Sequence, residues 1–276
     1  MKNVVLGIFD SGIGGLTVAR EIERRIPGVS YVYFGDTARL PYGTKTASTV
    51  VNYAIQNSKF LKAKGATMPI IACNTASAAI LKTKGANKKI SLIFKNSKTF
   101  NVIEPAVEAA KEATKNKKIG VLATPTTVNS RIYERLLPGY KVVSVPAPLL
   151  VPLIEAGWEY RPETKSILRE YVNPLKKAGV DTVILGCTHY PFIAKLVRDM
   201  MGDKVKIINP AVQTAEKIEL FVRQQKAKPQ GVLTTRNYLN KLNKYPHRRF
   251  YVSDLPKGFS KQAARFMGHP IKARLI

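Results

Sequence analysis

Short apolar runs that alternate with longer amphipathic stretches constrain the fold of this chain more than any other feature. The runs are rich in Val and Ile, are not interrupted by alternating polar residues, and are bounded by Gly, Pro or Asp. Strands buried on both faces of a parallel sheet have this pattern. The expected strands are residues 4–9, 31–35, 69–73, 119–123, 141–145, 182–186 and 205–208.

Helical patterns fill the intervals between these runs, over residues 17–25, 48–64, 105–115 and 162–177. Regular alternation of strands and helices predicts the α/β class, with mostly parallel sheets flanked by helices. A chain of 276 residues is long enough for one large domain or two of moderate size. No Gly/Ser-rich linker is present, so a boundary between domains must be a tight crossover.

Residues 69–78 and 182–191 form a weak internal repeat, because each is an apolar strand that ends in Cys and is soon followed by Thr. In an open α/β sheet, ligands bind at the carboxyl ends of the strands. Two such ends in two similar halves could face each other across one cleft.

Cys73 and Cys187 are the two cysteines of the chain. Their separation fits neither a disulfide framework nor a zinc site, and it favours a reducing compartment. The apolar run near the N-terminus is too short for a signal peptide, and no run approaches membrane-spanning length. The sequence therefore predicts a cytoplasmic protein that binds neither metal nor membrane.

The charge balance is strongly basic, with 45 Lys and Arg against 18 Asp and Glu and a net charge of +27. Such a charge attracts polyanions. Basic residues are concentrated in residues 82–98 and 223–276. A solvated basic surface explains the same numbers, because net charge reports on solubility and not on fold. We therefore expect only weak, non-specific binding to nucleic acid.

Both cysteines lie where chemistry is expected. A cysteine is usually a small buried hydrophobe. Cys73, however, lies between a strand and a helix that begins near Asn74 and Thr75, and a helix N-terminus stabilises a thiolate and offers free N–H donors. Cys187 repeats the placement and is followed by Thr188 and His189. Equivalent positions for both cysteines favour a functional role over simple burial.

His189 and the turn from Asp10 to Gly15 are further candidates. His189 is either an ordinary core or surface histidine whose hydrogen bonds are satisfied or, because it lies beside a thiol, a group that relays a proton or orients that thiol. The glycines of the turn permit close backbone approach. Thr17 stands where a dinucleotide fingerprint needs glycine, and no P-loop Lys follows, so a nucleotide loop is the weaker interpretation. Asp10 and Ser11 fit better as polar groups directed into a cleft.

Two opposed thiols suit the inversion of a stereocentre. One group removes a proton from one face, and the other delivers a proton to the opposite face. A thiol is suitable because modest changes in its environment move its pKa towards neutrality. Nothing indicates a pyridoxal phosphate site, although a Schiff-base lysine is not excluded among so many lysines.

Six segments in order resemble the glutamate racemases: FDSGIGGLTV (9–18), YFGDTARLPYGTK (33–45), ACNTASA (72–78), VIEPAV (102–107), LVPLIEAG (150–157) and LGCTHYPF (185–192). The resemblance implies two α/β domains that meet at an active-site cleft. The expected first domain is residues 1–98 with 210–276, and the second is residues 99–209. It also implies conversion of L- to D-glutamate for peptidoglycan, without cofactor or metal. A homodimer is expected.

Carried over by motif, Cys73 exchanges the proton with D-glutamate and Cys187 with L-glutamate. Asp10 assists Cys73, while His189 and Glu155 assist Cys187. The residues expected to hold the substrate are Asp10, Ser11, Tyr42, Gly43, Asn74, Thr75, Thr127, Thr188 and His189, with Thr124 and Ser130 as further polar lining.

The chain also departs from the family pattern. Residues 91–101 are longer and more basic than the short strand expected before VIEP, and Asn209 and Gln213 stand where acidic residues are usual. Because no extended segment precedes the first strand, regulation by a peptidoglycan precursor through such a segment is not expected. The open alternatives are a racemase of another amino acid such as aspartate, and a polyanion-binding protein. A purely structural protein leaves both cysteine positions unexplained.

Overall fold

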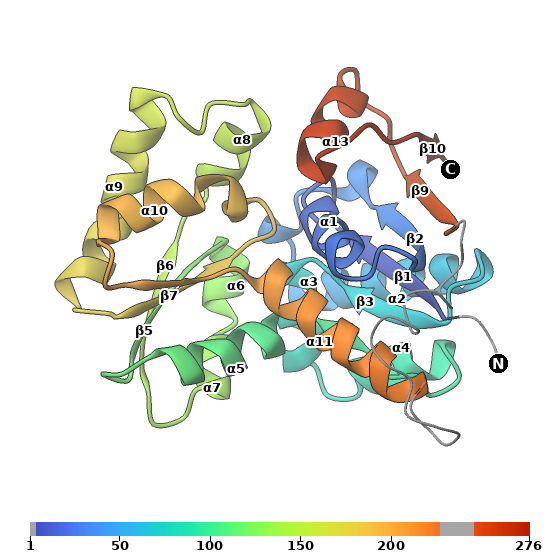
Figure 1. Ribbon diagram of the computed structural model, residues 1–276, viewed down its shortest axis with the longest axis horizontal. Coiled ribbons are helices and arrows are strands. Elements are labelled where there is room, and N and C mark those ends of the chain that lie inside the picture. Colours follow the sequence, from blue (N-terminus) through green and yellow to red (C-terminus); the bar gives the residue numbers. More distant parts are fainter. Residues whose placement is uncertain (1–3, 227–245) are drawn as a thin grey trace.

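Two parallel sheets with helices on both faces make up the computed structural model, which describes residues 4–226 and 246–276 (Figure 1). The first sheet has the order β10-β9-β2-β1-β3-β4 and the second has the order β6-β5-β7-β8. Every pairing in both sheets is parallel. The predicted α/β class is therefore confirmed.

The strands of the first sheet are β1 (Val5–Asp10), β2 (Ser30–Gly35), β3 (Met68–Ile71), β4 (Phe100–Asn101), β9 (Arg248–Val252) and β10 (Ala273–Leu275). The strands of the second sheet are β5 (Lys118–Ala123), β6 (Lys141–Pro146), β7 (Thr182–Gly186) and β8 (Lys206–Ile208).

The helices are α1 (Leu16–Arg25), α2 (Ala47–Ala63), α3 (Asn74–Lys82), α4 (Ala86–Ile93), α5 (Ile103–Ala113), α6 (Pro125–Asn129), α7 (Ile132–Leu136), α8 (Leu150–Glu155), α9 (Pro162–Lys177), α10 (Ala194–Met201), α11 (Pro210–Lys226) and α13 (Phe259–Met267). Short 3₁₀ turns are η1 (Thr37–Arg39), η2 (Tyr42–Thr44) and η3 (Tyr190–Ile193).

Strand β2 shows why the apolar runs are continuous. Tyr31 and Tyr33 face a core that includes residues of α1 and α13, whereas Val32 and Phe34 face a second core formed with α2, α3 and α4. Successive side chains of a strand point to opposite faces, so a sheet covered on both faces needs apolar residues at every position. The second sheet is covered in the same way, with α9 on one face and α5 and α7 on the other.

Two strands of the described residues, β9 and β10, are absent from the sequence-based expectation, and β4 corresponds to the short strand that the family pattern places before VIEP. Strand β9 has the sequence RRFYV, and its two arginines hide it from a search for apolar runs. Both arginines have polar partners at the rim of the sheet. Arg248 forms an ion pair with Glu23 at 3.3 Å, and Arg249 donates to the carbonyl oxygen of Lys64.

The segment 91–101 contributes only the two residues of β4 to the sheet. Its first residues end α4, and Lys95 and Asn96 then adopt positive φ angles of 56° and 61°. The extra length seen in the sequence is therefore a helix end and a turn. It is not a longer strand.

The strands divide between the two sheets broadly as the expected domains do, except that β4 (Phe100–Asn101) pairs in the first sheet although it falls within residues 99–209. The domain division at residues 98/99 and 209/210 stays a prediction. The first sheet takes strands from both ends of the described chain, and the second takes strands from the middle. We call each sheet with its covering helices a half of the molecule, the first sheet giving the first half and the second sheet the second half. Helix α11 packs against α1 of the first half and α5 of the second (Figure 1). Within the described residues, no helix has the length and apolar character needed to cross a membrane.

Candidate active site

Cys73 lies two residues after β3 ends and is the N-cap residue of α3. Its Sγ accepts a hydrogen bond from the backbone N–H of Ala76 at 3.4 Å, and it lies 3.6 Å from the Ser11 hydroxyl. The thiol is 4% exposed. Burial, together with the negative charge of Asp10, raises the pKa of Cys73 to about 12, despite the lowering effects of Ala76 and Ser11. The Cys73 thiol therefore holds its proton strongly.

Asp10 ends β1 and is fully buried. One carboxylate oxygen, Oδ2, accepts the backbone N–H of Gly12 at 3.0 Å, whereas Oδ1 has no hydrogen-bond partner among the residues that the structure describes. Burial raises the pKa of this carboxyl, although the charge of His189 and the nearby backbone N–H groups lower it. A buried acceptor without a partner is unusual in a folded protein and marks a place where a ligand donor can bind.

Cys187 directly follows β7 and is 7% exposed. Its surroundings differ from the equivalent placement predicted by the repeat, because the 3₁₀ turn η3 follows it and the α-helix α10 begins only at Ala194. Pro191, which lies in this turn, has no N–H to donate. Cys187 consequently lacks the N-cap position of Cys73 and has a histidine beside it instead.

His189 connects Cys187 to Glu155. Its Nδ1 lies 3.8 Å from Cys187 Sγ, and its Nε2 lies 2.9 Å from Glu155 Oε1. Burial alone lowers the pKa of His189. The interactions with Cys187 and Glu155 outweigh burial and raise this pKa to about 10. The raised pKa favours the protonated ring, which places a positive charge next to the Cys187 sulfur.

Polar contacts join the two halves around these thiols. Thr17 donates to the carbonyl oxygen of Thr188 at 2.9 Å. Thr75 Oγ1 lies 3.1 Å from Thr124 Oγ1 and 3.4 Å from Thr127 Oγ1. These bonds connect segments that follow strands of different sheets, so the carboxyl ends of the two sheets meet at one site.

Asn74 faces the second half. Its Oδ1 accepts a hydrogen bond from the Tyr133 hydroxyl at 3.3 Å, and its buried Nδ2 has no hydrogen-bond partner in the described part of the chain. Asn74, Cys187 and Thr188 line one narrow cavity. The charge of Cys187 contributes to the raised pKa of Cys73, because the two thiols are close enough to interact.

The segment with Tyr42 and Gly43 is anchored by a residue that the sequence reasoning did not single out. Asp36 is fully buried and accepts hydrogen bonds from the Tyr42 hydroxyl, from Arg39 Nε at 2.9 Å and from Ser253 Oγ at 3.0 Å. The Tyr42 hydroxyl is thus directed into the interior, and the Gly43 carbonyl oxygen accepts a bond from Thr126 across the halves. The position of Asp36 at the end of β2 was the available signal.

One expected lining residue, Ser130, lies close to this site without sharing its central contacts. Ser130 Oγ donates to the carbonyl oxygen of Thr127 at 2.6 Å and lines a separate cavity with Lys82 and Asn129. His247 and His269 lie in the C-terminal part of the chain, where His269 Nε2 is 3.0 Å from Glu23. In residues 4–226 and 246–276, no three His, Cys, Asp or Glu side chains are grouped as metal ligands would be.

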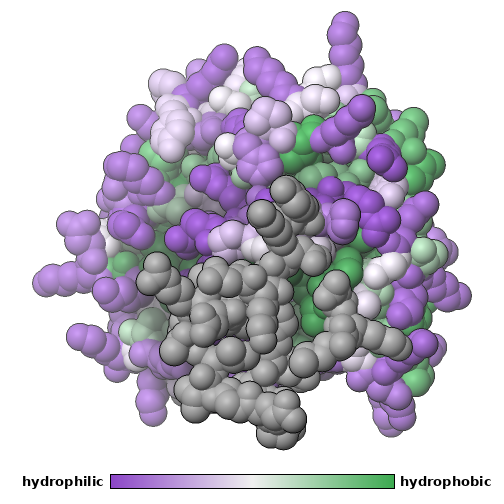
Figure 2. Space-filling model, turned by 45° about the vertical axis from the view of Figure 1, so that its right-hand side comes forward, coloured by the Kyte–Doolittle hydropathy of each residue, from purple (hydrophilic) through white to green (hydrophobic). Residues whose placement is uncertain are grey.

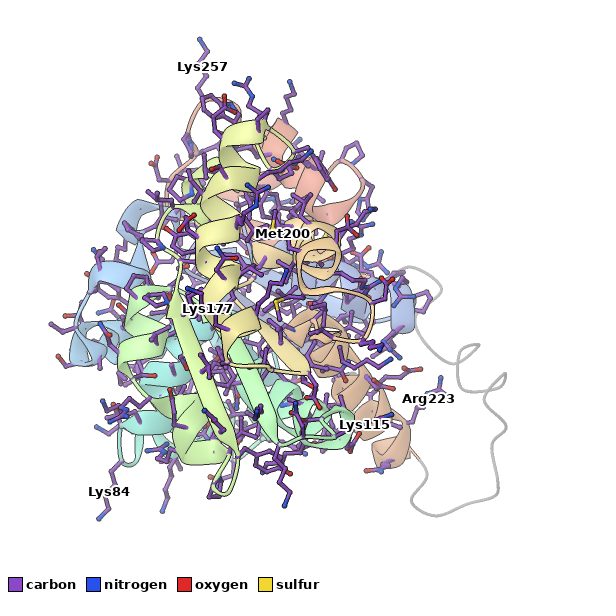
Figure 3. The ribbon with its side chains drawn as sticks, turned by 90° about the vertical axis from the view of Figure 1, so that its left-hand side faces the viewer. Lys84, Lys115, Lys177, Met200, Arg223 and Lys257 are labelled. Atoms are coloured by element: carbon purple, nitrogen blue, oxygen red, sulfur yellow. The ribbon has the colours of Figure 1, made fainter. Side chains whose placement is uncertain are left out.

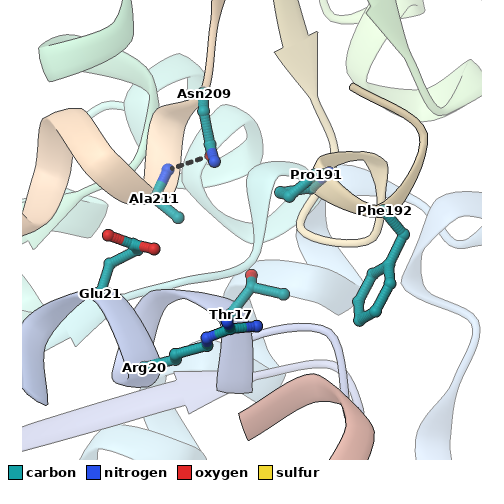
Figure 4. A pocket seen from close by; sticks show the side chains of 7 residues that line it. All are labelled: Thr17, Arg20, Glu21, Pro191, Phe192, Asn209 and Ala211. Carbon is teal, nitrogen blue, oxygen red and sulfur yellow. Dashed lines mark hydrogen bonds between the residues drawn. The ribbon is translucent and has the colours of Figure 1, made fainter. Parts of the chain in front are cut away.

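A further cavity of about 90 Å³ lies between the two halves, next to the Thr17–Thr188 contact. Figure 4 shows its side chains, which come from α1, from η3 and from the start of α11. The lining residues are Thr17, Arg20, Glu21, Pro191, Phe192, Asn209 and Ala211.

The fold and the paired strand ends agree with a known class of enzymes. A sequence model of the family "Asp/Glu/Hydantoin racemase" matches residues 14–218. The chain belongs to this family.

Its relatives narrow the assignment to the glutamate racemases. Glutamate racemase from Neisseria meningitidis is 40% identical over 271 residues, which are 97% of this chain and 94% of that protein. A crystal structure of a glutamate racemase isoform from Bacillus anthracis has a TM-score of 0.87 at 33% identity, covering 100% of this chain and 98% of that one. The enzyme from Francisella tularensis, solved with D-glutamate, has a TM-score of 0.84 at 32% identity with the same coverage.

Proposed function

We propose that this chain interconverts L- and D-glutamate by proton transfer at Cα, with Cys73 and Cys187 as the two acid/base groups. The observation that carries the proposal is that two buried thiols follow strands of different sheets whose carboxyl ends meet, and that each thiol lies beside a different ionisable partner. The near-full-length likeness to glutamate racemases supports glutamate as substrate over another amino acid such as aspartate. Supply of D-glutamate for peptidoglycan is the corresponding role in the cell.

In the proposed reaction, L-glutamate loses its α-proton to the Cys187 thiolate, and the Cys73 thiol donates its proton to the opposite face of Cα. The enzyme is left with Cys187 protonated and Cys73 ionised, and the reverse transfer converts D-glutamate to L-glutamate. Two similar groups on opposite faces are required because one base alone returns the proton to the face it left.

Neighbouring groups have distinct roles in this proposal. The His189 imidazolium stabilises negative charge on Cys187, and Glu155 orients the ring through its 2.9 Å contact. Asp10 exchanges protons on the Cys73 side. The groups proposed to bind the substrate's ammonium and carboxylates are Asp10, Ser11, Tyr42, Gly43, Asn74, Thr75, Thr127, Thr188 and His189.

Two buried polar atoms that lack hydrogen-bond partners among the described residues support the proposal that Asp10 and Asn74 bind the substrate. Asp10 Oδ1 suits an ammonium, and Asn74 Nδ2 suits a carboxylate. Both atoms are buried, and leaving them unpaired costs free energy that a bound amino acid recovers.

Incubation of the purified protein with L-glutamate, without added cofactor, tests the proposal by chiral analysis of the product. We expect racemisation, with deuterium at Cα of the D-glutamate formed in D₂O. Cys73→Ala and Cys187→Ala should each abolish interconversion while circular dichroism shows a folded protein. Racemisation at the original rate by either variant contradicts the two-thiol mechanism, and dependence on pyridoxal phosphate contradicts cofactor independence. Parallel incubation with L-aspartate decides the substrate.

We also propose that the protein works in the cytoplasm as a homodimer. Neither cysteine forms a disulfide, which suits a reducing compartment. The second half exposes the large apolar side chains of Leu149, Trp158 and Tyr160, which a second copy can cover. Analytical ultracentrifugation measures the assembly directly, and a single monomeric species at micromolar concentration contradicts it.

We also propose weak nucleic-acid binding through the two basic stretches, residues 82–98 and 223–276, whose described residues lie in different parts of the surface. Hydrophilic side chains cover much of the face in Figure 2. Lys84 and Lys257, from the two basic stretches, point outward at opposite ends of the view in Figure 3. Residues 227–245 of the second stretch lie outside the described residues. We expect duplex DNA binding of about 10⁻⁴ M at physiological salt, at the weak limit of non-specific complexes. No binding at low salt refutes it.

A further inference from the structure

Helix α13 connects the first half of the molecule to the end of the helix that carries Glu155. It lies between β9 and β10 in the chain, and Phe259, Ala263 and Phe266 are buried in one core with residues of α1. Figure 1 shows α13 beside α1, with α8 across from it in the other half. Two polar side chains on α13 bridge this space.

These two side chains bind the last carbonyl groups of α8. Gln262 Nε2 donates to the Glu155 carbonyl oxygen at 3.1 Å, and Arg265 Nη1 donates to the Ile154 carbonyl oxygen at 2.8 Å. Carbonyl groups at the end of a helix lack the partners of its interior. A guanidinium at this end also interacts favourably with the helix dipole. The two bonds therefore fix the backbone from which the Glu155 side chain projects.

Arg265 is itself held in place. Its Nη2 forms an ion pair with Glu159, which is only 7% exposed, and its guanidinium carbon lies 4.7 Å from the centre of the Phe192 ring. Arginine suits such a place because its rigid fork bonds in two directions while its flat face stacks on an aromatic ring. The phenyl ring of Phe192 is visible in Figure 4, at the edge of the cavity beside Thr17.

The same helix contacts the histidine directly. The buried ring of Phe266 lies edge-on to the His189 ring, with centroids 5.2 Å apart and an interplanar angle of 77°. His189 is thus held by Glu155 at Nε2 and by Phe266 against its ring. Both contacts depend on where α13 lies.

We propose that Gln262 and Arg265 are positioning residues for the Cys187 side of the reaction. They hold the end of α8 so that Glu155 keeps the His189 ring in place against Cys187. The inference rests on the proposed racemase function. Within the described residues, α13 makes no hydrogen bond to Asp10, Ser11 or Cys73, whereas two of its side chains bond the end of α8, so the larger effect falls on the proton transfer at Cys187.

The test must distinguish proton transfer at Cys187 from proton transfer at Cys73. The two enantiomers of glutamate have equal free energy in water, so any mutation must change kcat/KM equally in the two directions. The primary deuterium isotope effect separates them. With 2-deuterated L-glutamate it reports transfer to Cys187, and with 2-deuterated D-glutamate it reports transfer to Cys73. Slowing the Cys187 step should raise the first isotope effect and lower the second.

The test uses Gln262→Leu, which removes one donor, and Arg265→Lys, which keeps the charge beside Glu159 but loses the forked geometry. Each should lower kcat/KM by about five- to tenfold, as expected for one lost hydrogen bond at a positioning group. The ratio of the L to the D isotope effect should rise above that of the wild type. Lys261→Met, an exposed position on the same helix, is the matched control and should change neither quantity.

The outcomes separate the two proposals. A wild-type protein that does not racemise glutamate refutes the proposed function itself. If the wild type is active and the variants lose activity with an unchanged isotope-effect ratio, the residues serve only the fold and the positioning role is overturned. A ratio that shifts towards the D side also overturns it. Should Arg265→Lys fail to fold, Gln262→Leu decides the question alone, because its loss leaves no buried charge unpaired.

Discussion

The close approach of Gly14 to the second half gives the sharpest test of how the two halves meet. A Cβ atom added at Gly14 would lie 2.3 Å from Thr188 Oγ1 and 2.6 Å from His189 Nδ1. Real Cβ atoms essentially never come within 3.0 Å of another heavy atom. Gly14→Ala therefore forces Thr188 and His189 away from the turn that precedes α1.

The size of the effect follows from what holds the displaced groups. Relief of the overlap needs a movement on the order of 1 Å, and His189 cannot rotate freely because Glu155 and Phe266 hold its ring. Overpacking of this kind costs about 1–3 kcal/mol of folding stability. A misplacement of about 1 Å at a reacting group costs about 10²-fold in rate. We expect kcat/KM for glutamate to fall about a hundredfold.

Gly12→Ala is the matched control, two residues earlier in the same turn. Its added Cβ would meet Leu40 Cδ2 at 2.5 Å, the far end of a flexible side chain that is 43% exposed and free to move. Both variants are compared by polarimetric racemisation rates and by urea denaturation. Equal activity of Gly14→Ala and wild type would falsify the tight contact, and equal losses in both variants would show that the turn tolerates no side chain anywhere.

Two further outcomes are expected. Arg39→Met leaves the buried carboxylate of Asp36 without its ion pair, so urea denaturation should show that the free energy of unfolding falls by about 3 kcal/mol. KM for glutamate should also rise, because Asp36 anchors the segment that contains Tyr42 and Gly43, and an unchanged KM contradicts this anchoring. The pKa of His189 is raised from its ordinary 6.5 to about 10, so its stabilisation of the fold is fully present below pH 6.5 and is lost as pH rises through about 10. The unfolding free energies of wild type and His189→Gln should converge over that range, and a gap that is constant from pH 6 to 10.5 contradicts the raised pKa.

Much of the fold and the centre of the site could be predicted from sequence because their signals are local. Strands covered on both faces must be apolar at every position, as β2 shows, and that pattern is visible in any short window. Both cysteines were placed at strand ends for the same reason. The strand ending before Cys73 was predicted two residues too long, because Ala72 and Cys73 continue the apolar run after the β3 pairing has stopped.

The remaining features depend on contacts between distant parts of the chain. Gln262 is 107 residues from Glu155, and nothing in the helix around it indicates that its amide meets a carbonyl group of another helix. Strand β9 is stabilised by partners of its arginines that lie more than 180 residues away, at Lys64 and Pro27. Asp36 looks like an ordinary turn residue until Ser253, from the other end of the chain, is seen to donate to it.

The two thiols occupy similar strand ends in opposite electrostatic surroundings, and this difference has a consequence for the proposed mechanism. Burial and the nearby Asp10 carboxylate raise the pKa of Cys73 to about 12, so the proton rests there, while the His189 imidazolium lies beside Cys187. In the proposed reaction, this distribution of charge suits L-glutamate, because Cys187 accepts its α-proton and the Cys73 thiol already carries the proton to be donated. D-glutamate requires the proton to leave Cys73 first, and Asp10, with its own pKa raised by burial, is the adjacent group suited to accept it. In the proposed mechanism, one side of the cleft works through a positive charge and the other through a carboxyl group, and this difference explains why two similar strand ends have different partners in one reversible reaction.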